Sequence, residues 1–321
     1  MANNTTTTLT GQYQNYFSRE LLDYAIQELH LNEFAQMADL PKNVGGTAIS
    51  FFRYGAGASS NVQTLTEGIT PTTTRDLALT KINATLTPYG ELAITTDILG
   101  LTELFDALKQ AIKSMGEDAA LNADDISRNE LVSAGTKRYA QNAATFAALG
   151  AAGVSASKWI ATDGLDVATV LKVQRAKTFQ GQYVAVIPPQ ISRDVMNDPD
   201  WIKADNYAGS KKIFKGEIGI LHGVRYVEAT NPFREDSGGA EGTNVAAGDI
   251  FSTMYLGTNA FGVPKLSGDK PMSPRVYIVR GADKNDPLDQ TSKAGWKAFY
   301  TAKSLNENWY RVYKSRSAHV A

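Results

Sequence analysis

No cysteine occurs anywhere in the 321 residues of this chain. This absence excludes disulfide frameworks, thiol nucleophiles and cysteine-ligated zinc or iron–sulfur sites. Histidine is almost as scarce, because His30, His222 and His319 are the only three and lie far apart in the sequence. Metal sites and general bases need convergent ligands or an orienting partner. We therefore expect no catalytic residue, no metal site and no cofactor-binding residue.

The sequence also lacks an excess of charge of either sign. Lys and Arg total 32 against 33 Asp and Glu, a formal net charge of −1, so no overall positive field would attract nucleic acid. The longest weakly polar stretch, 143–154, is shorter than the roughly 20 residues of a membrane span. Residues 1–20 lack the pattern of a secretory signal. These features predict a soluble globular protein that does not contact a membrane.

What is present begins with an uncharged segment. Residues 1–17 contain no Lys, Arg, Asp or Glu and are rich in Thr, Asn and Gln, so they predict an arm rather than a core element. Ser18 is a plausible N-cap for a helix that follows. In that helix Leu21, Leu22 and Ile26 recur at helical spacing, and we expect this apolar stripe to dock on another surface.

A long segment separates two strand candidates. Residues 47–54 and 77–86 are rich in β-branched and aromatic or aliphatic residues, which favours strands. The large apolar side chains between them are only Val62, Leu65 and Ile69, too few for a core. Loops of this length are uncommon in compact domains, and an isolated two-stranded hairpin is marginally stable. The sequence therefore predicts a protruding hairpin laid against a neighbouring molecule.

The remainder mixes helices and strands. Apolar residues at helical spacing predict one long helix from Leu101 to Ala134, ended by Gly135. The second half predicts a further helix and several strands, at 164–177 for the helix and 183–187, 217–221, 224–228 and 275–280 for the strands. Together they give an α+β fold.

Two groups of charges have an ordinary interpretation. Arg311, Lys314 and Arg316 lack an accompanying groove or aromatic platform, so we interpret them as surface charge rather than phosphate contacts. Asp124 and Asp125 point in directions about 100° apart on a helix and do not converge on one ion. We interpret them as part of a solvated helix face.

Short motifs spread over nearly the whole chain resemble one family. Their order and spacing are similar to those of the major capsid proteins of N4-type tailed bacteriophages, which adopt the Hong Kong 97-like capsid fold. The matching stretches include Leu40-Pro41-Lys42-Asn43, Phe51-Phe52-Arg53-Tyr54, Leu65-Thr66-Glu67-Gly68-Ile69-Thr70-Pro71, Tyr89-Gly90, Thr96-Asp97, Ile187-Pro188-Pro189, Gly223-Val224-Arg225-Tyr226 and Gly295-Trp296-Lys297.

The resemblance implies a division of the chain into five parts. These are an N-terminal arm at 1–46, an extended loop with its flanking strands at 47–97, and a peripheral domain with a long spine helix at 98–159. An axial domain follows at 160–274, and residues 275–321 return to the peripheral domain. Within the extended loop, the residues implied to contact the adjacent subunit are Leu65, Thr66, Glu67, Gly68, Ile69, Thr70 and Pro71.

The function implied is structural and not enzymatic. Copies of the chain would self-assemble into pentamers and hexamers of an icosahedral phage head, which encloses double-stranded DNA. The partners implied are the chain itself, a scaffolding protein and a portal protein, while the binding of a decoration protein stays open. The location implied is the capsid of the virion, after assembly in the host cytoplasm.

Two other functions stay open at this point. A shell protein of a cargo-enclosing cellular nanocompartment would share the fold, and its particles would contain a docked enzyme rather than genomic DNA. An intracellular α+β hydrolase would need catalytic residues brought together only in space. It would show a closed apolar pocket holding titratable groups with perturbed pKa values.

Overall fold

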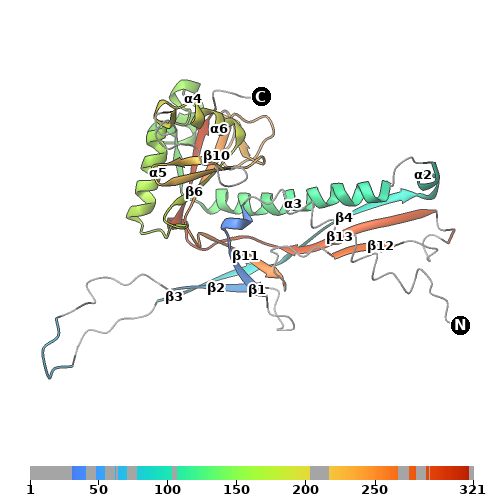
Figure 1. Cartoon of the computed structure of the whole chain (residues 1–321), viewed down its shortest axis with the longest axis horizontal. Helices are drawn as coiled ribbons and strands as arrows, with labels where there is room; N and C mark the ends of the chain where they lie inside the picture. Colours follow the sequence, from blue (N-terminus) through green and yellow to red (C-terminus); the bar gives the residue numbers. More distant parts are fainter. Residues whose placement is uncertain are drawn as a thin grey trace.

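The computed structural model describes residues 31–40, 48–54, 62, 64–70, 78–102, 107–202, 217–266, 275–279, 287–288 and 290–317. Figure 1 shows three parts: a rounded lobe, a long limb that runs away from it, and a hairpin that reaches out in the opposite direction. The lobe contains helices α4 to α6 and the largest sheet. The limb consists of helix α3 and a sheet that lies along it.

The lobe is built on a seven-stranded mixed sheet, whose strand order is β5-β15-β10-β6-β8-β7 with β9 beside β10. The central strand β10 is buried along its whole length and pairs with β15 over seven residues. The strands are β5 (Lys137–Tyr139), β6 (Tyr183–Ile187), β7 (Glu217–Leu221), β8 (Val224–Glu228), β9 (Phe233–Glu235), β10 (Ile250–Leu256) and β15 (Tyr310–Arg316). The helices are α4 (Phe146–Ala151), α5 (Ala161–Val173) and α6 (Pro189–Met196).

Aromatic side chains fill the core between the sheet and its helices. Tyr226 makes edge-on ring contacts with Trp159, Trp201 and Tyr255, with centroids 5.5 to 6.3 Å apart. The indole Nε1 of Trp159 donates a hydrogen bond to the Tyr255 hydroxyl at 3.1 Å. Gly164 of α5 makes room for this cluster, because a Cβ there would lie 2.5 Å from the Tyr226 hydroxyl oxygen.

The limb pairs one long helix with a three-stranded antiparallel sheet. Helix α3 (Ala107–Ala134) follows the short helix α2 (Asp97–Thr102), and the sheet order is β12-β13-β4. Its strands are β4 (Thr87–Thr96), β12 (Arg275–Val279) and β13 (Thr291–Tyr300). Buried residues of α3 share one apolar cluster with alternate residues of β13, namely Ile112, Met115 and Ala119 with Ala294, Trp296 and Ala298. None of the helices in the described part combines the length and hydropathy needed to span a bilayer.

The predicted long helix is confirmed over its described length, from Ala107 to its last residue Ala134. The predicted helix at 164–177 is α5, which begins earlier and ends at Val173, where Arg175 turns into a left-handed conformation with φ 53°. The strands predicted at 183–187, 217–221 and 224–228 are β6, β7 and β8. The α+β fold class is confirmed.

The hairpin joins the body through a small sheet. Strands β2 (Ala48–Tyr54) and β3 (Leu79–Thr85) pair antiparallel from Ala48 opposite Thr85 to Tyr54 opposite Leu79. These are the two strand candidates that flank the predicted loop. Beside them lies a three-stranded sheet of β1 (Gln36–Leu40), β11 (Phe261–Leu266) and β14 (Lys303–Ser304).

Candidate assembly surfaces

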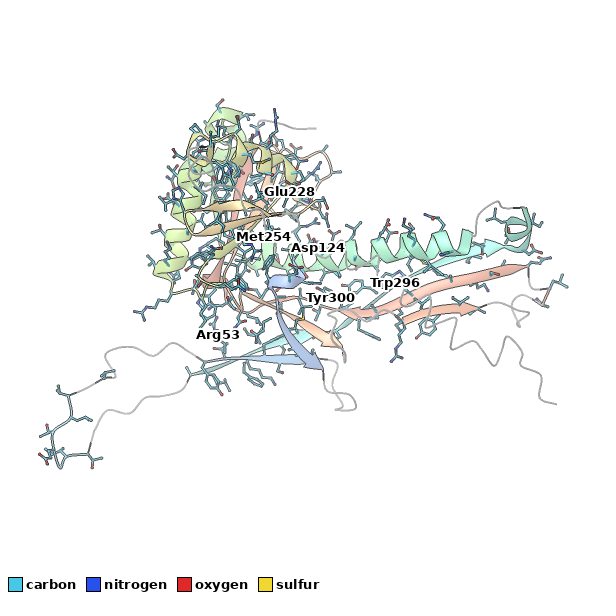
Figure 2. All side chains as sticks on the ribbon, viewed as in Figure 1. Arg53, Asp124, Glu228, Met254, Trp296 and Tyr300 are labelled. Atoms are coloured by element: carbon cyan, nitrogen blue, oxygen red, sulfur yellow. The ribbon has the colours of Figure 1, made fainter. Side chains whose placement is uncertain are left out.

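One face of the β2–β3 hairpin is fixed to the body. Side chains alternate between the two faces of a strand, and Ile49, Phe51 and Ala84 point inward to form a small core with Leu305. The guanidinium Nη1 of Arg53 donates a hydrogen bond to the Leu305 carbonyl oxygen at 3.1 Å. Figure 2 shows Arg53 where the hairpin leaves the body. The base of the hairpin is therefore rigidly placed.

The other face of the hairpin is apolar and uncovered. Phe52, Tyr54 and Leu79 are each more than half exposed. Tyr54 and Leu79 lie directly opposite each other in the ladder, and Phe52 lies opposite Lys81. Aromatic side chains on a solvated strand face lose the benefit of burial, so a contiguous exposed group of this kind marks an interaction surface.

The described part of the hairpin tip continues this pattern. Val62, Leu65 and Ile69 are all largely exposed. The chain turns at residues 66–69, where the Ile69 amide donates to the Thr66 carbonyl at 3.2 Å and Gly68 has φ +78°. This φ value is the one that the third position of a type II turn requires.

The seven predicted contact residues of the extended loop thus fall at this tip. Residues 65–70 are all exposed, and Pro71 lies outside the described residues. Their contact with an adjacent subunit stays a prediction. The predicted N-terminal helix residues Leu21, Leu22 and Ile26 also lie outside the described residues.

A second apolar surface covers the side of the limb sheet that faces away from α3, and we call it the outer sheet face. Its large apolar side chains are all substantially exposed: Leu92 and Ile94 from β4, Tyr277 and Val279 from β12, and Phe299 from β13. Interspersed with them are three cations, Arg275, Lys293 and Lys297, which the strand alternation places on the same face. The Lys297 ammonium lies 5.2 Å from the centroid of the Phe299 ring.

No carboxylate balances these cations among the described residues of the three limb strands. Their only acidic residue is Glu91, whose Oε2 accepts a hydrogen bond from Trp296 Nε1 at 3.4 Å. Trp296 is buried between the sheet and α3, as Figure 2 shows. The outer sheet face therefore combines apolar area with positive charge.

The lobe and the limb are joined by a buried arginine. Arg128 of α3 is 2 % exposed. Its Nη1 donates to the main-chain oxygen of Asn231 at 3.1 Å, to the side-chain oxygen of Asn231 at 2.6 Å and to the Pro232 carbonyl at 3.2 Å. Its Nη2 lies 2.9 Å from Asp125 Oδ1, and the guanidinium lies 5.7 Å from the centroid of the Phe233 ring. This arrangement fixes α3 to the connection between β8 and β9.

The neighbouring turns of α3 hold the chain where it enters the described part. Asp124 Oδ1 accepts a hydrogen bond from the Leu31 amide at 3.1 Å. The hydroxyl of Tyr300 donates to Asn32 Oδ1 at 2.7 Å and lies 2.8 Å from the Ser127 hydroxyl. Asp124 is 1 % exposed, so its interpretation as part of a solvated face was wrong: the residue is needed inside, as an acceptor for the entering chain.

The C-terminal basic residues are also not simple surface charge. Lys314 and Glu235 are both 0 % exposed, and their Nζ and Oε1 atoms are 2.7 Å apart. Glu241 Oε1 lies 3.3 Å from the same ammonium, and the Gly242 amide donates to Glu235 Oε1 at 2.6 Å. The buried charge is thus compensated, and the pair holds the 241–242 segment on the sheet. The surface interpretation of Lys314 was wrong because β15 lies inside the lobe sheet.

The two arginines that flank Lys314 also have partners. Arg316 Nη2 forms an ion pair with Asp249 Oδ2. Arg311 Nη1 donates to the Glu307 carbonyl oxygen at 2.7 Å, and its side chain is largely buried. Neither guanidinium is therefore positioned as a free phosphate contact.

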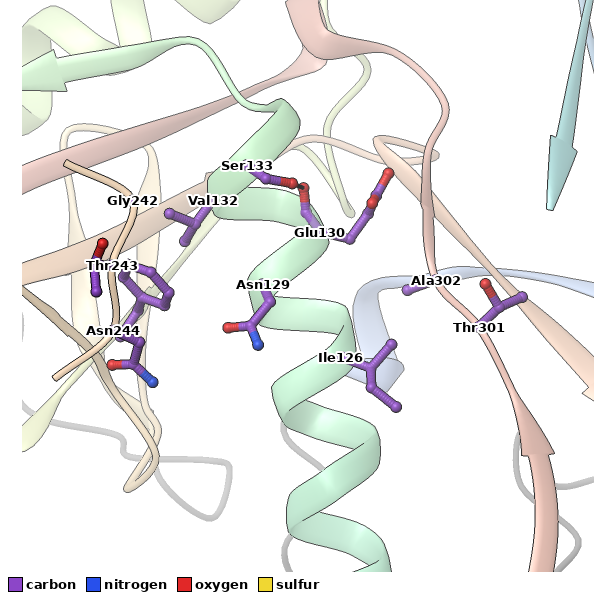
Figure 3. A pocket seen from close by; sticks show the side chains of 11 residues that line it. Ile126, Asn129, Glu130, Val132, Ser133, Gly242, Thr243, Asn244, Thr301 and Ala302 are labelled. Carbon is purple, nitrogen blue, oxygen red and sulfur yellow. Dashed lines mark hydrogen bonds between the residues drawn. The ribbon is translucent and has the colours of Figure 1, made fainter. Parts of the chain in front are cut away.

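A crevice of 720 Å³ lies between α3 and the loop at 242–244 (Figure 3). Its lining is Ile126, Asn129, Glu130, Val132, Ser133, Phe233, Gly242, Thr243, Asn244, Thr301 and Ala302. Glu130 is the one titratable side chain among them, and it pairs with Lys303 Nζ at 2.8 Å and the Ser304 amide at 3.2 Å. Within the described residues no group of three or more His, Asp or Glu could hold a metal ion.

The contact of Arg128 with the connection between β8 and β9 was not predicted from the sequence. Its partners Asn231 and Pro232 are 103 and 104 positions away, so no local pattern connects them. The available signal was weak: the buried apolar residues Leu131 and Val132 follow Arg128 by about one helical turn. The Lys314–Glu235 pair was also missed, because neither β9 nor β15 was predicted from the sequence.

Comparisons with known proteins agree with this architecture. Residues 165–264 match the family model described as phage capsid protein, while no curated protein matches the chain. The capsid of Ralstonia phage GP4 is similar at 13 % identity and TM-score 0.64, covering 90 % of this chain and 88 % of that chain. The cyanophage Pam1 capsid asymmetric unit is similar at 14 % identity and TM-score 0.61, covering 92 % and 93 %.

A further similar structure is the virus-like particle from Pyrococcus furiosus. Its chain is 9 % identical, with TM-score 0.53, and the match covers 94 % of this chain and 99 % of that chain. These likenesses extend over nearly the whole chain, well beyond the residues that the family model matches. The fold is the Hong Kong 97-like capsid fold.

Proposed function

We infer that this chain is the major capsid protein of an icosahedral phage head. The observation that carries this conclusion is the capsid fold over about nine tenths of the chain, together with the phage capsid match at residues 165–264. The chain thus has a structural role in a shell made of many copies of itself. The N4 type of phage, and the five-part division of the chain, are predictions within this conclusion.

The exposed apolar surfaces support a contact between copies. Figure 1 places the hairpin tip and the limb sheet at opposite ends of the molecule, so the tip of one copy cannot reach its own outer sheet face. A contact between two different patches is heterologous, and such contacts form rings when the rotation between successive copies closes. We propose that the tip, residues 65–71, lies on an adjoining copy and that these contacts build the pentamers and hexamers.

Charge also favours this contact. Glu67 is the one acidic residue of the described tip, whereas the outer sheet face carries Lys293 and Lys297 without a described carboxylate. The apolar tip residues would cover the apolar part of that face. The N-terminal stripe of Leu21, Leu22 and Ile26 would add a second arm on the shell.

The remaining partners follow from the proposed role. A phage head assembles around a scaffolding protein, has a portal protein at one vertex and then encloses double-stranded DNA, and the assembly would take place in the host cytoplasm. The near-zero net charge is compatible with DNA that must move within the head, because each phosphate contact with Lys or Arg would add salt-dependent binding.

A shell that encloses cellular cargo is the second candidate. The likeness to the virus-like particle from Pyrococcus furiosus, which covers 99 % of that chain, supports it only in that a particle from a cellular organism has the same fold. The two functions differ in what the particles contain. Particles purified from the native source would hold genomic DNA for a phage head and a docked enzyme for a cargo shell.

Assembly itself tests both candidates. The purified chain, with scaffold where needed, should form capsomers or closed shells in analytical ultracentrifugation and electron microscopy. A strictly monomeric protein under all assembly conditions would contradict the conclusion. A hydrolase would instead show turnover as a monomer, independent of any particle.

The tip contact has a sharper test. The double variant Leu65→Asp, Ile69→Asp should melt at the wild-type temperature but fail to form shells. The matched control is Val173→Asp, which also places a carboxylate at an exposed apolar position, but on the lobe. Normal shells from the double variant would refute the tip contact, while shells that are lost in both variants would show a nonspecific effect of charge.

A further inference from the structure

Among the described strands, β4 is an edge of the limb sheet. The strand order β12-β13-β4 leaves it with one neighbour, and it pairs with β13 through all ten of its residues. At about 3.4 Å per residue, β4 is roughly 34 Å long. The described residues provide no backbone hydrogen bond to its other side. A row of main-chain donors and acceptors is therefore available for another strand.

This edge lacks the features that usually prevent an edge strand from pairing with other chains. Natural edge strands carry charges, especially Lys, or are short, bulged or covered. From Gly90 to Thr96 the only charged residue is Glu91, which bonds Trp296 on the helix side of the sheet. Leu92 and Ile94 are 62 % and 57 % exposed. The opposite edge strand β12 is shorter, with five residues, and carries Arg275.

We propose that residues 1–17 of the same chain pair with the free edge of β4 and extend the limb sheet by one strand. This segment contains no charged residue and includes Thr5–Thr8, Thr10, Tyr13, Tyr16 and Phe17, types that favour strands. Its residues Leu9, Tyr13 and Phe17 recur at even spacing, so one face of the added strand would continue the exposed apolar face of β4. The interaction is strand addition, in which the main chain gives affinity and alternate side chains give specificity.

The position of Asn32, near the start of the described part, supports the same chain as the source of the added strand. Asn32 accepts a hydrogen bond from Tyr300, and Tyr300 lies opposite Thr87, the first residue of β4. Residues 18–31 connect this point to the uncharged segment. Even as a continuous helix they would span about 21 Å, so the segment can reach the edge, and its tethering gives it a high effective concentration there.

The consequence is control over association. A long uncovered edge with exposed apolar side chains would pair with the same edge of other subunits and cause aggregation. When the chain's own N-terminal segment covers this edge, copies of the chain can associate only through other surfaces, such as the hairpin and the outer sheet face. This inference concerns the isolated subunit and does not depend on the proposed capsid function.

Hydrogen exchange of the isolated subunit tests the pairing. Successive amides of an antiparallel strand point to opposite sides, so one alternate set in β4 points to the free edge. In the full chain this set should exchange slowly, and in a variant lacking residues 2–17 it should exchange at least tenfold faster. The amides of the central strand β10 should not change. Equal rates for the free-edge amides in both proteins would overturn the proposal.

Two further experiments separate pairing from other effects of truncation. Thr6→Pro, Thr8→Pro removes strand amides at unchanged length and should reproduce the faster exchange, whereas Thr6→Ser, Thr8→Ser should not. Because the chain has no cysteine, Ile94→Cys can be combined with single cysteines at positions 5 to 13. Intrachain disulfides at one position and its even-spaced neighbours would support the proposal. Disulfides formed only between chains, or none at all, would refute it.

Discussion

The guanidinium of Arg128 bonds both the main-chain and the side-chain oxygen of Asn231, at 3.1 and 2.6 Å. One residue belongs to the long helix of the limb and the other to a connection of the lobe sheet. Asn231 Nδ2 in turn donates to Asp125, which also pairs with Arg128. The angle between lobe and limb is therefore set by a closed polar group, not only by apolar packing.

Breaking this group should cost much stability. In Arg128→Met the side chain retains its apolar length, but the two oxygens of Asn231 lose a buried charged donor, and the loss should be about 1.5–3 kcal/mol in the free energy of unfolding. The matched control is Arg138→Met, because the ion pair of Arg138 with Asp166 is partly solvated on both sides. That change should cost about 0–1 kcal/mol. Urea denaturation measures both, and equal losses would contradict the role of the joint.

Acid should weaken the attachment of the 241–242 segment. Burial alone would raise the pKa of Glu241, but the hydrogen bond from Tyr139 and the Lys314 ammonium outweigh it and lower this pKa below its ordinary value of 4.5. A carboxylate with a lowered pKa stabilises the fold above its ordinary pKa and loses that contribution as the pH falls through the folded value. Glu241→Gln should therefore be less stable near neutral pH and show a shallower loss below about pH 4.5. Parallel curves for variant and wild type would contradict this.

The opposite dependence of stability on pH is expected from Asp163. Burial raises its pKa, although the hydrogen bonds from the Tyr313 hydroxyl and the Gln141 amide act against this. A carboxyl group whose folded pKa is raised gains stability for the fold as the pH falls through that value. Asp163→Asn keeps an oxygen acceptor for both donors and should remove this gain. Thermal unfolding between neutral and acidic pH would show a smaller upward trend in the variant, and an unchanged trend would refute the assignment.

The close packing around Tyr226 predicts that replacing Gly164 will destabilise the fold. In Gly164→Ala the new methyl group would lie 2.5 Å from the Tyr226 hydroxyl oxygen, which must then move within a close-packed core. Overpacking of this kind costs about 1–3 kcal/mol. Gly153→Ala is the control, because its Cβ meets nothing within 4 Å and its φ is −63°. Calorimetry should show a lower melting temperature for the first variant only.

The charge match between the tip and the outer sheet face can be tested by reversal. Glu67→Lys should slow shell assembly without changing the melting temperature of the subunit, because like charges would then meet across the contact. Combining it with Lys293→Glu and Lys297→Glu should restore at least part of the assembly rate, measured by light scattering. Glu67→Gln, which removes the charge without reversing it, should lie between wild type and Glu67→Lys. Failure of the combined variant to recover would indicate a different landing site.

Local patterns were sufficient for some elements of the fold. Strand β6 is a short apolar run ended by prolines, and α3 keeps its apolar positions at helical spacing from Ile112 to Leu131. The hairpin could be predicted from what it lacks, because its segment offers too few large apolar residues for a core. These features need no knowledge of distant residues.

Other elements depend on partners far along the chain. Strand β13 alternates small and aromatic buried residues with lysines, and its long ladder to β4 joins residues about 200 positions apart, as in Trp296 opposite Glu91. Lys314 and Glu235 become buried only when β15 lies in the sheet. Such pairs are properties of the assembled fold, so Asp124 and Lys314 were interpreted as surface residues although both are buried.

The length of α3 has a mechanical consequence. Its last turns are fixed to the lobe at Arg128, while its 28 residues extend along the limb for about 42 Å. From Arg128 to Ala107 the helix extends about 32 Å, so a tilt of about 5° at Arg128 would displace the far end by about 3 Å. Small adjustments where one guanidinium meets one asparagine are thus magnified into ångström-scale displacements at the far end of the limb, which in the proposed shell would change the angle between neighbouring subunits.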